Sequence, residues 1–305
     1  MTTPPTRFRA LRGVRTFAAL VAAIALATGA HGATRRSVTF VLGKDPDGRS
    51  YLSAASTYYA MHAGANDETI TSLRSLQDVR EYLADPAKRG GSPWGTIRLV
   101  AHGSEWTGLR VPIFSGDPAP ATLHHLEDAV ASGEFPSIDR SIADAGTLFQ
   151  IDSCGIGRRP QLQRAIARLF LAGNNAAQFV ASRNYVAFRA WTGMDGIRRS
   201  ERAELPYVAL VTRESSSQDR WRDLLERRWR ATVGPVERDT LPLHSMPIEI
   251  SVDARASQAA LQPILYDIGL RKDQLSWSDD QQGRRVGRAW IVTLADSLTE
   301  WSIDP

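Results

Sequence analysis

Short apolar runs alternate along this chain with stretches whose apolar residues recur at helical spacing. A β-branched run at 37–42 predicts a buried first strand, and further short apolar runs predict strands at 96–101, 147–151, 178–182 and 207–211. Apolar positions three and four residues apart predict helices at 51–62, 75–83, 121–131 and 161–172. Strands that alternate with helices favour a mostly parallel sheet covered by helices on both faces.

The pattern changes after residue 215. A run of serines precedes a charged helix expected at 219–230, and a strand at 247–252, a helix at 257–266 and a strand at 288–294 follow. These elements predict a small C-terminal α+β extension, which either is an appended subdomain or continues the main sheet. The fold class we expect is α/β: a three-layer α/β/α sandwich with a mostly parallel central sheet, plus that extension.

The first 32 residues follow a different pattern. Residues 1–16 carry four arginines and no acid, residues 17–27 form an apolar, alanine-rich run, and small residues follow it. This order is typical of a secretory signal peptide cleaved near residues 30–33. The apolar run is too short to span a bilayer comfortably, so a retained anchor is the alternative interpretation. We expect a periplasmic or secreted protein with no stable membrane insertion after signal removal.

The signal also accounts for the basic charge of the chain. The formal net charge is +4, and the four arginines before residue 16 contribute all of it, so the mature chain is expected to be neutral. Its remaining basic residues occur as short pairs or among acids. A nucleic-acid partner is therefore not expected.

Cysteine and histidine usage narrows the chemistry. Cys154 is the only cysteine, so a secreted form of this chain has no internal disulfide. The thiol is then a small buried hydrophobe, an intermolecular link or a reactive group. The histidines show no metal-ligand spacing with a second cysteine or a pair of carboxylates, so we expect no metal site and no cofactor.

Two of the predicted strands end on a reactive side chain followed by glycine. His102 and Gly103 follow the strand at 96–101, and Cys154 and Gly155 follow the strand at 147–151, about fifty residues later. Catalytic groups gather beyond the carboxyl ends of parallel strands, and a thiol needs a base to become a strong nucleophile. We therefore predict a catalytic pair of Cys154 and His102. The amides of Gly103 and Cys154 are candidates for an oxyanion hole, and the glycines after Cys154 are expected to leave room for an acyl group.

These motifs resemble those of caspase-fold (clan CD) cysteine peptidases, the group that holds caspases, metacaspases, legumains and gingipains. Asp152-Ser153-Cys154 is similar to the metacaspase motif, although Gly-Ile-Gly stands here where metacaspases have His-Ser-Gly. His102-Gly103-Ser104 with Trp106 is closer to the gingipain pattern. The resemblance covers roughly residues 37–212. It implies a caspase-like sandwich in which His102 is the general base and Cys154 the nucleophile.

The resemblance leaves substrate preference open. In metacaspases the residue matching Asp152 helps to bind a basic side chain, which would imply cleavage after Arg or Lys. The alternative is an Asp152 that orders the turn through hydrogen bonds to loop amides. Ser182, with Arg183 and Trp191, is a candidate wall of the substrate-binding pocket, and each of them is equally a candidate for core or rim.

The expected domain organisation is a signal peptide at 1–32, a caspase-like catalytic domain at 33–215 and the C-terminal α+β extension at 216–305. The leading hypothesis is a secreted or periplasmic cysteine endopeptidase, a hydrolase acting on proteins or peptides. A non-catalytic binding module on the same fold is the first alternative. A secreted α/β protein whose single thiol only fills space in the core is the second.

Overall fold

A five-stranded parallel sheet lies at the centre of the computed structural model, which describes residues 35–45, 50–173, 176–213, 218–235, 241–253, 258–280 and 282–295. Its strand order is β2-β1-β3-β7-β8, and every neighbouring pair is parallel. The strands are β1 (Ser37–Leu42), β2 (Asp67–Ile70), β3 (Thr96–Ala101), β7 (Leu148–Asp152) and β8 (Gln178–Ala181). The predicted mostly parallel sheet is confirmed.

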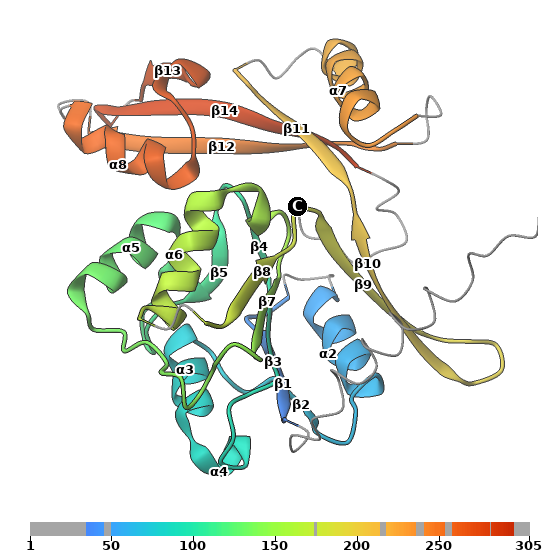
Figure 1. Cartoon of the computed structure of the whole chain (residues 1–305). Coiled ribbons are helices and arrows are strands. Elements are labelled where there is room, and N and C mark those ends of the chain that lie inside the picture. The colour runs from blue at the N-terminus through green and yellow to red at the C-terminus, as the bar shows by residue number, and fades with distance from the viewer. Residues whose placement is uncertain are drawn as a thin grey trace, which may run out of the picture. The chain divides into compact units, whose positions relative to one another are not determined.

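Helices cover both faces of this sheet (Figure 1). On one face α2 (Tyr51–Met61) buries its apolar side against Val41 and Val100, which alternate with residues of the opposite face. The other face packs against α3 (Leu76–Ala84), α5 (Leu123–Ser132) and α6 (Pro160–Leu171), with Leu99 and Ile151 in the same hydrophobic cluster. A short helix, α4 (Pro86–Arg89), follows α3. The expected three-layer α/β/α arrangement is therefore confirmed.

Local signals set the ends of these helices. Ser75 and Asp78 form a capping box at the start of α3, in which each side chain accepts the backbone N–H of the other residue. Pro86 then begins α4, where the missing N–H of proline costs no helical hydrogen bond. The same preference places Pro160 at the first turn of α6.

Several strands were not predicted from the sequence. A small antiparallel sheet contains β4 (Gly103–Ser104), β5 (Gly108–Pro112) and β6 (Pro120–Ala121). A long hairpin pairs β9 (Tyr185–Thr192) with β10 (Arg198–Leu205). The sequence of β10 is rich in arginine and glutamate and lacks an apolar run, because most of this strand is half-buried or exposed. It therefore carries no strong strand signal.

A second, antiparallel sheet lies in the C-terminal part of the chain. Its order is β11-β14-β12, and β13 also pairs with β14; the strands are β11 (Tyr207–Thr212), β12 (Leu243–Asp253), β13 (Ser276–Asp279) and β14 (Arg284–Ala295). Alternate residues of β14 face two helices. Val292 and Leu294 pack with α7 (Gln218–Thr232), whereas Ala289 packs with α8 (Gln258–Ile268). Figure 1 shows the long β12 and β14 strands of this sheet.

The strand at Tyr207–Thr212 differs from expectation in its partner. We expected it within the catalytic domain that ends at residue 215, but it pairs with β14 and so belongs to the C-terminal sheet. An apolar run predicts a strand without specifying which sheet it joins. The described residues from Arg36 onwards belong to one compact unit, which holds both sheets. The expected signal peptide at 1–32 lies outside the described residues.

Candidate active site

His102 and Cys154 lie at the same edge of the central sheet. The strands that carry them, β3 and β7, are adjacent and parallel, with Val100 in register with Asp152. His102 and Cys154 each stand two residues further along, so they occupy equivalent positions beyond neighbouring strand ends. His102 is 5% exposed and Cys154 is 3% exposed. The structure thus brings the two predicted side chains to adjacent strand tips.

The imidazole of His102 is held by a carboxylate that the sequence analysis did not select. Nε2 of His102 lies 2.9 Å from Oδ1 of Asp45, in the loop after β1. Asp45 also accepts the N–H groups of Leu52 and Ser53, at 2.8 and 3.2 Å, in the first turn of α2. When Nε2–H donates to this carboxylate, the neutral imidazole keeps Nδ1 as its basic nitrogen. Asp45 can therefore fix both the orientation and the tautomer of His102.

Tyr51 connects the two strand tips. Its ring lies against the His102 imidazole, with 4.8 Å between the ring centroids, and its hydroxyl donates to the Asp152 carbonyl at 3.2 Å. Burial raises the pKa of Tyr51 well above its ordinary value, and the nearby Cys154 and Asp152 add to this effect. The hydroxyl therefore stays protonated and remains a donor to the backbone of β7.

The glycines after Cys154 serve close packing rather than space for an acyl group. Gly155 has φ of 67°, and its N–H donates to the Asn184 carbonyl at 3.0 Å. A Cβ at Gly155 would lie 2.0 Å from the Tyr207 hydroxyl, and one at Gly157 would lie 2.3 Å from the Ala181 carbonyl. Neighbouring groups already fill the space beside both glycines. The expectation that they leave room above the sulfur is therefore wrong.

The backbone N–H of Gly103 points away from the β4–β5 ladder, as an oxyanion donor requires. Arg110 N donates to His102 O at 2.8 Å, which makes Gly103 and Leu109 a non-hydrogen-bonded pair in the β4–β5 ladder. The Gly103 N–H is therefore not directed into that ladder. A Cβ at this position would lie 2.4 Å from the Gly108 carbonyl, so glycine is required by this close approach.

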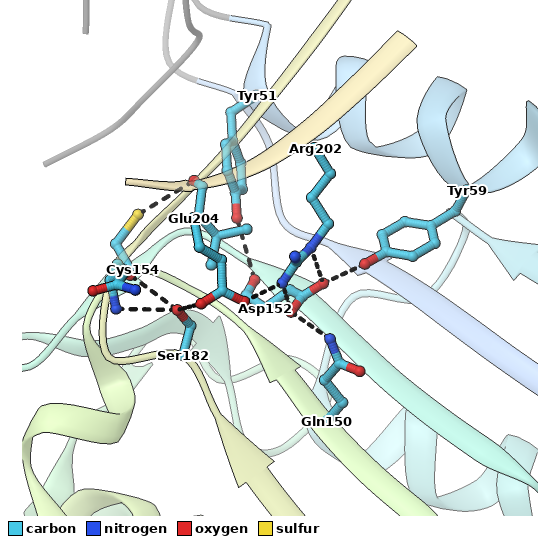
Figure 2. Close-up of polar contacts among 10 residues, drawn as sticks. Tyr51, Tyr59, Gln150, Asp152, Cys154, Ser182, Arg202 and Glu204 are labelled. Atoms are coloured by element: carbon cyan, nitrogen blue, oxygen red, sulfur yellow. Dashed lines mark hydrogen bonds and ion pairs between the residues drawn. The ribbon is translucent and has the colours of Figure 1, made fainter. Parts of the chain in front are cut away.

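Asp152 is occupied by other side chains of the same chain (Figure 2). Arg202, on β10, donates from Nε to Oδ2 at 3.1 Å and from Nη2 to Oδ1 at 2.9 Å. Tyr59 also donates to this carboxylate, as does Gln150 at 2.8 Å. Burial opposes the charge of Arg202, but the hydrogen bond and the charge of Asp152 raise its pKa overall. An ion pair between the buried Asp152 and the half-buried Arg202 thus ties β7 to the β9–β10 hairpin.

Ser182 belongs to the same polar network. Its hydroxyl donates to Glu204 Oε2 at 3.0 Å and accepts the Asn184 N–H at 3.1 Å, which orders the turn between β8 and β9. Glu204 in turn accepts from Arg202 at 2.7 Å. Figure 2 shows this path from Ser182 through Glu204 and Arg202 to Asp152.

Arg183 and Trp191, the other candidate walls of the substrate-binding pocket, lie in different parts of the structure. Arg183 lies beside Gly157, close to the loop that follows Cys154. Trp191 lies near the free end of the hairpin, opposite Arg199, with the Arg189 guanidinium 4.7 Å from its ring centroid. Trp191 therefore packs within the hairpin, away from the end of β9 that adjoins Cys154.

The cysteine side chain is covered by aromatic residues and by the C-terminal sheet. Its Sγ donates to the Val186 carbonyl of β9 at 3.6 Å. Cys154 forms a hydrophobic cluster with Tyr185, Tyr207 and Ala295, against which Trp106 packs. The two tyrosine rings stack with their centroids 4.1 Å apart. The thiol is therefore enclosed by side chains from several elements.

A half-buried carboxyl group, that of Glu105, adjoins this cluster. Tyr207 donates its hydroxyl to Glu105 Oε1 at 2.8 Å, and the Arg158 guanidinium lies 4.0 Å from the Tyr207 ring centroid. Burial raises the pKa of Glu105, although the Tyr207 hydrogen bond and the charges of Arg158 and Arg159 act in the opposite direction. Glu105 and Arg158 lie in the loops that follow the two strand tips.

A pocket of about 340 Å³ opens beside these loops. One wall contains Glu105, Trp106 and Arg158, and the other contains Tyr266 and Leu270 from α8 and the turn after it. This pocket places a mixed polar and apolar surface next to the two strand tips.

Asp45, Arg202 and Tyr207 are the site residues that sequence reasoning missed. Asp45 follows the first apolar strand, and a carboxylate beyond a strand end is a sequence signal for a site residue. Pairing Asp45 with His102 from that signal requires knowing that β1 is the neighbour of β3. Arg202 and Tyr207 lie on strands whose partners have no local signature in the sequence.

Comparisons with known proteins assign no family and no fold relative to this chain. No protein-family model, curated protein or solved structure matches this chain. Within the described ranges, no group of three or more His, Cys, Asp or Glu side chains could hold a metal ion. No helix in the described part of the chain is long and apolar enough to cross a membrane.

Proposed function

We propose that this protein is a cysteine endopeptidase, a hydrolase in which Cys154 is the nucleophile and His102 the general base. The observation that carries the proposal is the placement of both side chains beyond adjacent parallel strand ends, with Asp45 hydrogen-bonded to the imidazole. A nucleophile, a base and a group that orients the base are the three parts of this chemistry. The basic N-terminal segment supports export, so we propose a periplasmic or secreted location.

In the proposed reaction, His102 removes the thiol proton and Sγ of Cys154 attacks the scissile carbonyl carbon. The tetrahedral intermediate collapses to a thioester, while His102 returns the proton to the leaving amine. A water molecule then attacks the thioester, with His102 as base, and releases the carboxylic acid and the free thiol. Asp45 acts as a positioning residue because it stabilises the imidazolium and holds its orientation.

The amide groups of Gly103 and Cys154 are the proposed oxyanion donors. The support for Gly103 is the ladder geometry, which leaves its N–H outside the β4–β5 hydrogen bonds. A backbone donor beside the base can stabilise the charge that develops on the carbonyl oxygen.

Cleavage after Arg or Lys is a separate proposal that depends on Asp152. The carboxylate is 1% exposed and already binds Arg202, so a substrate guanidinium would have to displace that arginine. This arrangement favours a structural role of Asp152 over the specificity role, but one made through the side chains of Arg202, Tyr59 and Gln150 rather than through the loop amides that were expected. If Asp152 instead binds the basic side chain of the substrate, Arg202→Ala is expected to increase hydrolysis after Arg relative to hydrolysis after neutral residues.

The proposed function is tested with purified protein and a mixed library of peptides, including Arg- and Lys-ended reporters. Cys154→Ala is expected to abolish hydrolysis, and His102→Ala to lower kcat by about 10²- to 10⁴-fold. Asp45→Asn is expected to lower kcat with little effect on KM, because Asp45 does not contact substrate in this mechanism. His124→Ala is the matched control, since His124 is half-exposed and pairs with Asp128 on α5. Full hydrolysis by Cys154→Ala would refute the proposal.

The low exposure of His102 and Cys154 favours a second candidate, a non-catalytic binding module. In that case the thiol and imidazole pack inside the fold without reacting. The expected result is no hydrolysis by any variant, together with a Cys154 that iodoacetamide does not label near neutral pH. A catalytic pair instead loses its labelling at low pH when the imidazole is removed.

A further inference from the structure

The joint between the two sheets lies directly on Cys154. Among the clusters formed by the described residues, those of the central sheet contain no residue beyond Phe188. Those around α7 and α8 contain only residues from Val208 onwards. The cluster with Cys154 draws on both parts, because it adds Tyr207 of β11 and Ala295 of β14. Tyr207 and Ala295 are register partners at one end of the β11–β14 ladder. That end of the ladder covers the thiol.

Polar contacts add to this joint. Arg159, in the loop after Cys154, donates to the carbonyls of Tyr266 and Asp267 at the end of α8, the latter at 2.5 Å. Asp267 accepts the N–H of His124 at 2.8 Å, and the Tyr266 hydroxyl donates to Glu127 at 3.1 Å. Joints of this polar kind permit relative movement more readily than large apolar ones.

We propose that the C-terminal sheet is a built-in cover of the catalytic centre, held by Tyr207 and Arg159, which must move off Cys154 before a substrate can reach Sγ. This inference rests on the proposed function for its consequence, because it describes how access to that site is regulated. Cys154 is 3% exposed with the cover in place. A peptide carbonyl cannot approach a thiol enclosed to this degree.

The packing of each part makes such a movement feasible. The C-terminal sheet keeps its own apolar contacts on both faces, through Trp221 and Trp229 on one side and Leu261 and Leu265 on the other. Displacing the β11–β14 end from Cys154 therefore breaks the small mixed cluster and the polar joint, without opening either core. Local openings of this kind need less free energy than global unfolding.

The test is the rate at which iodoacetamide labels the single cysteine of the full chain. Tyr207→Ala removes the covering ring, and Arg159→Ala removes the anchor on α8. Each is expected to raise the labelling rate by about tenfold or more, since the rate follows the population of the open state. Slow labelling of the wild type relative to the urea-unfolded chain is expected as well.

Two matched variants serve as controls. Tyr82→Ala also removes a tyrosine hydrogen-bonded to a glutamate, Glu68, but it lies on α3. Arg271→Ala removes an arginine from the wall of the same pocket, but the guanidinium of Arg271 pairs with the nearby Asp273 rather than with the central sheet. Both controls are expected to label at the wild-type rate.

The outcomes separate this inference from the proposed function. Faster labelling of both variants without hydrolysis of any peptide would support the cover and contradict the peptidase. Cys154-dependent hydrolysis by the wild type, with labelling unchanged by either substitution, would support the peptidase and overturn the cover. If Tyr207→Ala fails to fold, Arg159→Ala decides alone: a folded variant that labels at the wild-type rate overturns the proposal.

Discussion

The proposed role of Asp45 depends on the groups that bind its carboxylate. Its carboxylate binds His102 on one side and two amides at the start of α2 on the other, so it is held at both ends. A carboxylate fixed in this way presents a defined acceptor to one nitrogen of the imidazole. Glu105 is a second acidic residue at this edge of the sheet, and burial raises the pKa of its carboxyl group.

Glu105→Gln is expected to change how stability depends on pH. Burial raises the pKa of Glu105 above its ordinary value of 4.5, so the folded state holds this proton more tightly than the unfolded state. The contribution of this group to stability is therefore present below pH 4.5 and is lost as the pH rises through the folded pKa. The substituted amide would stay neutral and still accept from Tyr207, so the variant should gain stability relative to the wild type as pH rises.

This prediction is checked by thermal unfolding from about pH 4 to about pH 8, where the Tm difference between variant and wild type should grow with pH. Glu68→Gln is the control, because Glu68 also accepts a tyrosine hydroxyl but is exposed. A Tm difference for Glu105→Gln that stays constant or shrinks with rising pH would contradict the assignment.

The β9–β10 hairpin shows how an element can be held by one buried pair. Its partner on the central sheet is Asp152, at the end of β7, and Arg202 is 19% exposed whereas Asp152 is 1% exposed. The sequence of β10 is polar, so the position of the hairpin beside the sheet relies on this pair and on the apolar, buried half of β9. Buried pairs contribute little compared with apolar packing, but breaking one of them leaves a charge without compensation.

Arg202→Ala is therefore expected to lower the free energy of unfolding by about 3–5 kcal/mol, measured by urea denaturation. The control is Arg288→Ala, which breaks an exposed pair with Glu249 and should cost no more than about 1 kcal/mol. The double variant Arg202→Met with Asp152→Asn should recover much of the loss, because it removes the uncompensated charge. A cost for Arg202→Ala as small as that of Arg288→Ala would show that the hairpin does not depend on this pair.

At the scale of the whole molecule, two sheets with separate apolar cores share one compact unit. The central sheet carries the two strand tips, and the C-terminal sheet packs against one of them, at Cys154. Because the cores are separate, we expect that the amides of one sheet can lose their protection from hydrogen exchange while those of the other sheet keep it.

Trp229→Ala should reveal this separation. Trp229 is buried between α7 and the C-terminal sheet, and its truncation is expected to cost about 3–5 kcal/mol. Hydrogen exchange should accelerate in β11, β12 and β14, while β1, β3 and β7 keep their protection. Trp94→Ala, in the core of the central sheet, should give the opposite pattern. Equal acceleration in both sheets, in either variant, would show that they unfold as one cooperative unit.

The amino-acid sequence by itself determined four of the five strands of the central sheet, which are β1, β3, β7 and β8, and the longer helices that cover it. It also determined the positions of His102 and Cys154 after two strand ends. These features follow from the spacing of apolar residues and from nearby glycines and prolines, which act within a few residues along the chain. Tertiary structure decided that Asp45 meets His102, that Arg202 fills Asp152, and that Tyr207 and Ala295 cover Cys154. Those contacts depend on strand order and on pairing between distant segments, for which local periodicity carries no signal.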